Sequence, residues 1–218
     1  MLAVFCDFDG TFSVQDVGST LARRHLADRR AKLWAEFEQG GSSAWEYAEQ
    51  LFEGFALPEQ ELFHFLETIE LDAGAHALVA WCAKRDISFR ILSDGFDHNL
   101  ECLQEIHGVR FDYTANALRY VEGRWHIRPG GPVPDCICGT GTCKKAVIEA
   151  WRVSHPRDVC VHIGDGRVSD TCGALAADLV FAKGSLAEEL EARGAVFERF
   201  QDLNDVIGSL DRRFSDYT

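Results

Sequence analysis

Two aspartates one residue apart, Asp7 and Asp9, close the first apolar stretch of the chain in the run CDFDGT. Like charges at this spacing repel one another, so the pair needs a neutralising partner. Two later apolar stretches also end in polar residues, the first at Ser93 and the second at Asp165 with Asp170 after it. Because the carboxyl ends of parallel strands meet at one edge of a sheet, we expect these side chains to be neighbours.

The chemistry of such a cluster follows from its charge. Four carboxylates packed together are costly unless a cation neutralises them, and an all-oxygen ligand set completed by water suits Mg²⁺. With a metal in place, one remaining aspartate can act as a nucleophile and another can donate a proton. The residues therefore predict a divalent-metal site that supports covalent catalysis.

The elements that position these residues alternate along the chain. The run LAVFC before Asp7 is short and apolar, which is typical of a buried parallel strand. After Ala73, helical patterns alternate with apolar strand patterns, and Glu122-Gly123 divides a stretch that reads as a β-hairpin. This alternation predicts an α/β fold with a doubly wound, mostly parallel sheet.

A helical block of three or four segments is expected between Val14 and Glu70, with Pro58 in the first turn of one segment. Its aromatic residues recur with helical periodicity, so we expect them mainly inside the block, with one or two free to line an apolar pocket. These residues are Trp34, Phe37, Trp45, Phe52, Phe55, Phe63 and Phe65.

Composition limits the partners. A net charge of -13 over 218 residues argues against nucleic acid and anionic membrane surfaces, because both would repel an acidic protein. No apolar stretch approaches the roughly 20 residues of a membrane span, and no leader pattern precedes the first strand pattern. We therefore expect a cytoplasmic protein, with a monomer and a homodimer both open.

The order of these groups resembles the haloacid dehalogenase superfamily of phosphotransferases. The order is Asp-x-Asp-Gly-Thr, a strand-end serine, a lysine before a helix, and Gly-Asp with a later aspartate, and it covers nearly the whole chain. The motifs SDGFD, CICGTGTCKKAVI and GDGRVSDTCGALAADLVFAKG are most similar to the subgroup of methionine-salvage and phosphoserine phosphatases. The resemblance implies a Rossmann-like core of residues 1–13 and 71–218, with a helical cap of residues 14–70 inserted.

Carried over residue by residue, the resemblance implies the catalytic roles. Asp7 would attack phosphorus to form an aspartyl-phosphate, and Asp9 would protonate the leaving oxygen and then activate water. Thr11 would orient Asp9. The Mg²⁺ ligands would be Asp7, Asp165 and the backbone carbonyl of Asp9.

The resemblance also implies the phosphate-binding groups. Ser93, Asp94 and Gly95 would surround the phosphoryl oxygens, and Lys144 would offset their charge. Asp170 would hold this lysine or a metal-bound water. Asp94 stands where phosphoserine phosphatases commonly have glycine, and its carboxylate would oppose a second anionic group on the substrate.

Two assignments need a choice. Lys144 and Lys145 are adjacent, and the distance to the first apolar helix positions favours Lys144 as the active-site lysine. In the helical block, Asp16 matches an acidic position that faces the substrate amine in phosphoserine phosphatases. Here it could equally face a hydroxyl or bind water.

The sequence thus favours a Mg²⁺-dependent phosphomonoester hydrolase of a small cytosolic metabolite, with a methionine-salvage-type sugar-like phosphate as one substrate class. A phosphoserine phosphatase and a small-molecule phosphotransferase are alternatives. A catalytically silent module that binds a phosphorylated ligand or a protein is an alternative from another class. The presence of every catalytic group argues against a protein without catalytic activity.

Three cysteines lie close together before Lys144. Cys136, Cys138 and Cys143 could supply thiolates to zinc, but three ligands without an obvious fourth fall short of a closed site. Reduced thiols in a loop near the pocket are the favoured interpretation, and a disulfide is a third one. His98 is expected on a helix surface.

Overall fold

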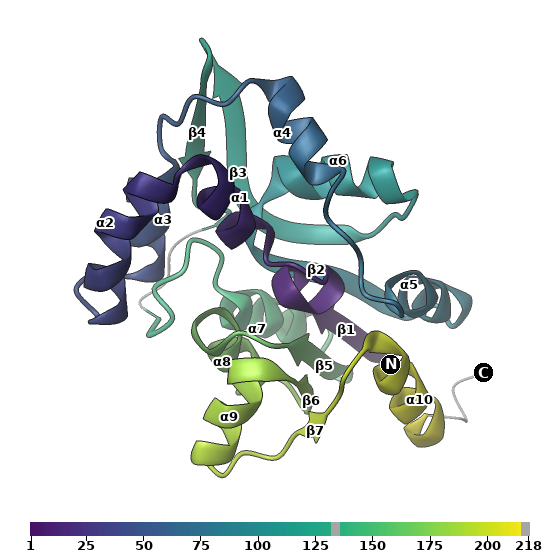
Figure 1. Ribbon diagram of the computed structural model, residues 1–218. Coiled ribbons are helices and arrows are strands. Elements are labelled where there is room, and N and C mark those ends of the chain that lie inside the picture. The colour runs from purple at the N-terminus through teal and green to yellow at the C-terminus, as the bar shows by residue number, and fades with distance from the viewer. Residues whose placement is uncertain (132–135, 215–218) are drawn as a thin grey trace.

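A seven-stranded sheet organises the protein (Figure 1). The computed structural model describes residues 1–131 and 136–214. Neighbouring strands are parallel except β3 and β4, and their spatial order is β4-β3-β2-β1-β5-β6-β7. The strands are β1 (Leu2–Cys6), β2 (Ser88–Phe96), β3 (Asp112–Val121), β4 (Arg124–Arg128), β5 (Val159–Gly164), β6 (Leu179–Ala182) and β7 (Glu198–Arg199). The predicted α/β fold with a doubly wound parallel sheet is confirmed.

Helices follow most of the strands along the chain. The helices that follow residue 70 are α5 (Ala75–Lys84), α6 (Asp97–His107), α7 (Lys144–Ser154), α8 (Arg167–Ala174), α9 (Gly184–Ala192) and α10 (Leu203–Arg213).

Among the described residues, no helix is both long and apolar enough to cross a bilayer.

Strand β1 lies at the centre of the sheet, between β2 and β5. All five of its side chains are buried. Leu2, Val4 and Cys6 belong to the apolar core that includes α5 and α10, whereas Ala3 and Phe5 belong to a second core with Ile148 of α7. Burial on both faces explains why the strand is apolar without alternation. It also places the residues that follow Cys6 between the carboxyl ends of β2 and β5.

The segment between β1 and α5 is helical, as expected, with four helices. They are α1 (Val17–His25), α2 (Ala27–Glu38), α3 (Ala44–Phe52) and α4 (Glu59–Leu66). Ser43 and Glu46 form a capping box that fixes the start of α3, and Pro58 directly precedes α4. One long helical pattern is divided at Leu26, where α1 ends and α2 begins. Figure 1 shows these helices gathered beside the hairpin of β3 and β4.

The aromatic residues of this segment are less buried than the periodicity predicted. Phe52, Phe55 and Phe65 are buried, but Phe63 is exposed, and α2 contains no buried residue. Helix α2 lies at the outer edge of the helical segment (Figure 1), so its aromatic side chains are only partly covered. Its Trp34 and Phe37 pack instead against Tyr47 of α3.

The β3–β4 hairpin holds the helical segment against the sheet. Its turn is the predicted one, with positive φ at Glu122 and Gly123 (50° and 80°). Trp125 of β4 is fully buried, its Nε1 donates to the carbonyl of Leu57 at 2.7 Å, and its ring stacks on Phe55 with centroids 6.1 Å apart. His98 is half-buried, with its ring centroid 4.9 Å from that of Trp125, and so is not a free surface residue.

We predict that Trp125→Ala lowers the free energy of unfolding by about 3–5 kcal/mol, because it leaves a large cavity and removes a buried hydrogen bond. Urea denaturation monitored by circular dichroism measures this change. Trp34→Ala is the matched control in the half-buried part of the segment and should lower the free energy of unfolding by only about 1 kcal/mol. Equal losses for the two variants would contradict the role given to Trp125.

Candidate active site

The turn after β1 brings its two aspartates to the edge of the sheet. A wide turn, η1 (Phe8–Phe12), follows Asp7, and Gly10 within it has φ 81°. A Cβ atom at Gly10 would lie 2.6 Å from Oδ2 of Asp165. Glycine at this position therefore permits both the left-handed backbone and the close approach of Asp165 from the end of β5.

Lys144 is the buried cation of the site. Its Nζ donates to Oδ1 of Asp7 and, at 2.5 Å, to Oδ1 of Asp170, and its side chain has no exposed surface. Lys145 is half-exposed and pairs with Glu149 at 3.6 Å on the same helix. Of the two adjacent lysines, Lys144 is the one that the structure brings to the predicted site residues.

A hydrogen-bond network fixes Asp170. His162 Nε2 lies 3.1 Å from Asp170 Oδ1, and the backbone N–H of Gly166 donates to Oδ2 at 2.9 Å. Burial acts to raise the pKa of Asp170, but the Lys144 ammonium outweighs this effect and holds the pKa below its ordinary value. For Lys144, burial acts in the opposite direction and lowers the pKa, but the carboxylates of Asp170 and Asp7 outweigh it and raise the pKa above its ordinary value. His162 was missed by sequence reasoning, and its only signal is a polar residue within the apolar run of β5.

Three carboxylates converge beside this ion pair. One oxygen each of Asp7, Asp165 and Asp170 lies within 4.8 Å of the others. Burial, and next the Asp170 carboxylate, raise the pKa of Asp7 well above its ordinary value despite the presence of Lys144. Thr11, expected to orient Asp9, donates its hydroxyl to Asp165 at 2.8 Å, because the turn at Gly10 directs it toward the end of β5.

Asp9 and Ser93 form the other half of the site. Ser93 donates its hydroxyl to Oδ2 of Asp9 at 3.2 Å and accepts from the backbone N–H of Gly95 at 2.9 Å. The N–H of Val17, the first residue of α1, donates to Oδ1 of Asp9 at 2.7 Å. Burial, with the nearby Asp16 carboxylate next, raises the pKa of Asp9 to about 7. At neutral pH, Asp9 can therefore carry a proton and donate it.

A narrow space of about 10 Å³ adjoins Asp9 and Ser93. It can hold about one water molecule. Oδ1 of Asn99, which is buried in its wall, has no hydrogen-bond partner among the described residues. A phosphate ester would require this space to widen. Its lining residues are Phe8, Asp9, Val17, Gly18, Ser93, Gly95, Phe96, Asn99 and Leu100.

Two predicted site residues have local structural partners. The carboxylate of Asp94 accepts from the side chain of Asn116 at 3.0 Å and from the backbone N–H of Thr142 at 3.2 Å. Asp16 caps α1, and its carboxylate accepts from the backbone N–H of Ser19 at 2.6 Å. Asp94 therefore links β2 to the segment before α7, while Asp16 lies at the end of α1 that contacts Asp9.

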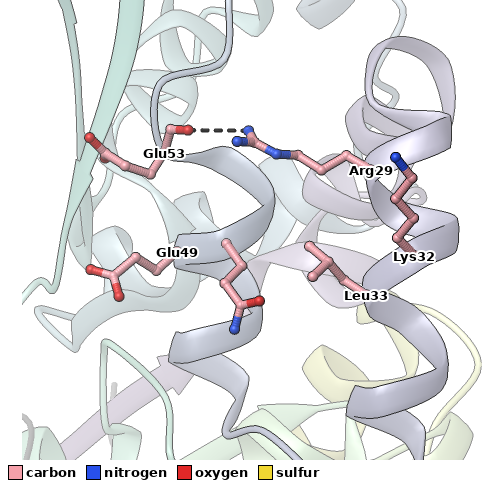
Figure 2. A pocket seen from close by; sticks show the side chains of 6 residues that line it. Arg29, Lys32, Leu33, Glu49 and Glu53 are labelled. Atoms are coloured by element: carbon pink, nitrogen blue, oxygen red, sulfur yellow. Dashed lines mark hydrogen bonds between the residues drawn. The ribbon is translucent and has the colours of Figure 1, made fainter.

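A second hollow, of about 430 Å³, lies between α2 and α3. Figure 2 shows Arg29 reaching across it to Glu53, whose backbone carbonyl it contacts at 3.1 Å. Its lining residues carry both signs of charge, and none belongs to the carboxylate cluster, so no catalytic role is assigned to it. They are Arg29, Lys32, Leu33, Glu49, Gln50 and Glu53.

The amino-acid sequence of this chain is similar to those of known proteins. Residues 4–174 match the family model described as haloacid dehalogenase-like hydrolase. A relative from Bacillus mycoides (strain KBAB4), named 2-hydroxy-3-keto-5-methylthiopentenyl-1-phosphate phosphatase, is 27% identical over 215 residues, which are 96% of this chain and 95% of the relative. A relative of the same name from Bacillus pumilus (strain SAFR-032) is 27% identical over 212 residues, which are 96% and 90% of the two chains.

Solved structures share the fold. A substrate-bound phosphoserine phosphatase complex superposes with a TM-score of 0.72 at 18% identity and covers 96% of this chain and 98% of its own. A phospho-aspartyl intermediate analogue of phosphoserine phosphatase superposes with a TM-score of 0.71 at 18% identity, with coverage of 95% and 98%. The family resemblance and the fold inferred from the motifs are both confirmed.

We predict that Lys144→Met lowers the free energy of unfolding by about 3–5 kcal/mol, since it leaves two buried carboxylates without their cation. Lys145→Met is the matched control one residue away and should change it by less than about 0.5 kcal/mol. Urea denaturation of both variants at pH 7 makes the comparison. If the two variants are equally stable, Lys144 does not have the structural role described here.

Proposed function

Since the chain belongs to the haloacid dehalogenase-like hydrolase family, we propose that it is a phosphatase that hydrolyses a phosphomonoester of a small cytosolic metabolite through an aspartyl-phosphate on Asp7. The observation that carries the proposal is the position of Asp7. This residue follows the central strand, contacts buried Lys144 and lies beside Asp165 and Asp170. Two relatives that are named as phosphatases align with this chain over 95% and 90% of their own lengths, and their names support the reaction class.

The donor set fits Mg²⁺. Four carboxylates surround the site, from Asp7, Asp9, Asp165 and Asp170, and the ammonium of Lys144 can neutralise only one of them. We propose that Asp7, Asp165 and the backbone carbonyl of Asp9 hold the ion, since hard oxygen donors suit it. When bound, Mg²⁺ supplies positive charge that stabilises ionised Asp7 and the phosphoryl oxygens.

The first chemical step is assigned to Asp7 and Asp9. An ionised oxygen of Asp7 forms a bond to phosphorus as the bond to the ester oxygen breaks. Asp9 gives its proton to the departing oxygen, which leaves as an alcohol. The pKa of Asp9, raised by burial to about 7, supports this role because the protonated form is then available near neutral pH.

The second step reverses the proton transfer. Deprotonated Asp9 takes a proton from water, the water oxygen bonds to phosphorus, and the bond to Asp7 breaks. Orthophosphate leaves, and both aspartates return to their starting states. The solved relative described as a phospho-aspartyl intermediate analogue supports such an intermediate here.

Ser93, Gly95 and Lys144 are proposed to bind the phosphoryl group. A Cβ atom at Gly95 would lie 2.8 Å from Asp9 Oδ2 and 3.0 Å from Ser93 Oγ, so glycine keeps the space beside both groups free. Lys144 compensates negative charge, which phosphoryl transfer requires more than elaborate covalent chemistry. Asp94 is proposed to contribute through its backbone N–H, because Asn116 donates to both its carboxylate and its backbone carbonyl.

Residues 14–70 are proposed to act as a cap on a core of residues 1–13 and 71–218. The chain enters and leaves this segment at two neighbouring positions. A β-bridge joins Ser13 to Leu71, and the backbone N–H of Val14 donates to the carbonyl of Glu70 at 2.8 Å. Val17 at the start of α1 contacts Asp9, and only about 10 Å³ is open there. Movement of the cap away from Asp9 would admit the substrate, and its return would exclude water from the closed site.

The substrate class is proposed from the curated relatives. A sugar-like phosphate of the type named for them is the first choice, and phosphoserine is the second because of the shared fold. Asp16, at the α1 end that contacts Asp9, is proposed to face a hydroxyl or amine of the leaving group.

We expect Asp7→Asn to lower phosphate release by at least about 1,000-fold, because the variant lacks the nucleophile. The measurement is orthophosphate release from a panel of small phosphate esters in the presence of Mg²⁺. Chelation should abolish release by the wild type, and added Mg²⁺ should restore it. The control is Asp112→Asn, at an exposed carboxylate outside the site, which should retain the wild-type rate. Unchanged turnover by Asp7→Asn would refute the mechanism.

For Asp9→Asn we expect a burst followed by a stall. The phenolate of an aryl phosphate made from an acidic phenol can depart without a proton from Asp9 while the phosphoryl group stays on Asp7. About one equivalent of phenol per chain should therefore appear quickly. Water would then lack its general base, and steady turnover should fall by about 100-fold or more. Stopped-flow absorbance measures both phases. Full steady-state turnover by the variant would remove Asp9 from the acid–base role.

A further inference from the structure

Four cysteine thiols form a second cluster, separate from the carboxylates. The Sγ atoms of Cys136, Cys138, Cys143 and Cys172 all lie within 4.8 Å of one another. The first three come from the segment that precedes α7, and the fourth comes from α8. Cys172 is the fourth thiol of the cluster, and the sequence did not reveal it because no spacing pattern connects it with the other three.

The geometry of the cluster suits a tetrahedral metal ion. A zinc–sulfur bond is about 2.3 Å long, which places the four sulfurs of a tetrahedral site about 3.8 Å apart. All four cysteines are free thiols in the structure, so none is consumed by a disulfide. A site made of sulfur alone selects a thiophilic ion such as zinc, whereas Mg²⁺ prefers oxygen.

The backbone around the thiols is arranged to support such a site. Gly139 adopts φ 60°, and its N–H donates to the carbonyl of Cys136 at 3.1 Å, so a tight turn brings Cys136 and Cys138 to the same side. The Thr140 hydroxyl donates to Cys138 Sγ at 3.2 Å. Backbone N–H groups also reach three of the sulfurs, from Thr140 to Cys138, from Ala146 to Cys143 and from Lys145 to Cys172. Such donors stabilise thiolate ligands.

We propose that Cys136, Cys138, Cys143 and Cys172 bind one structural Zn²⁺ ion. Four protein ligands complete the tetrahedron and leave no position for substrate or water, which defines a structural rather than a catalytic site. Cys138, Cys143 and Cys172 are buried and Cys136 is half-buried, so the ion is shielded from solvent.

The proposed ion joins elements that carry the active site. Cys143 directly precedes Lys144 at the start of α7, and Cys172 lies in α8 close behind Asp170. The same segment reaches α3, since the carbonyl of Gly139 accepts from the N–H of Trp45 at 2.8 Å. Zinc would therefore tie α7 to α8 and fix the segment that contacts the helical block.

The first test is the metal content of the purified protein. Elemental analysis should find about one zinc per chain, and Cys172→Ser and Cys138→Ser should each lose it. Cys82→Ser is the matched control, since Cys82 is equally buried but lies outside the cluster, and it should keep its zinc. Asp7→Asn should also keep zinc, which separates this site from the carboxylate cluster and from the proposed phosphatase reaction.

The second test reports on the ligands and on stability. Cobalt substituted for zinc should show the intense visible absorption of a tetrahedral thiolate site, and Cys172→Ser should lack it. Removal of zinc by a strong chelator should lower the Tm, and Zn²⁺ but not Mg²⁺ should restore it.

Three results would overturn the proposal. The first is a wild-type protein that carries no zinc and takes up none when zinc is added to the reduced form. The second is a native disulfide between any two of the four cysteines. The third is a Cys172→Ser variant that retains a full equivalent of zinc.

Discussion

The buried contact of Lys144 with Asp7 and Asp170 is the interaction on which the rest of the structure depends. A buried ammonium is tolerated only when carboxylates surround it, and the carboxylates need the ammonium equally. The three residues come from the start of α7, the end of β1 and the helix after β5. Charge balance in one place therefore fixes the relative positions of three elements, and the carboxylates left over are the ones proposed to hold Mg²⁺.

The topology of the sheet makes this contact possible. Strand β1 is central, and the chain winds outward from it in both directions, first to β2 and later to β5. Side chains that follow these three strands consequently meet at one edge, where helix starts also supply N–H groups. Burial of β1 on both faces holds its end rigidly, so Asp7 and Asp9 are presented by a framework rather than by a free loop.

The two proposed metal sites differ in their chemistry, although both involve residues at the start of α7 and in α8. The carboxylate cluster offers hard oxygen donors, and the thiol cluster offers only soft sulfur donors. The difference in donor type would favour a different ion at each site, since Mg²⁺ binds thiolates poorly and zinc favours them. On this view the sulfur site ties α7 to α8, and the oxygen site performs chemistry at the edge of the sheet, where β1 and β5 end.

The alternation of strands and helices and the hairpin turn at Glu122-Gly123 could be predicted from the sequence alone, because periodicity and turn residues act over a few positions. The family resemblance came from the order of the motifs along the chain. Other features required the tertiary structure. Thr11 bonds to Asp165 across 154 residues of chain, and His162 joins Asp170 although it lies within an apolar strand. Cys172 completes a cluster that spacing left with three members. Local patterns cannot encode such contacts, because packing between distant elements decides which side chains meet.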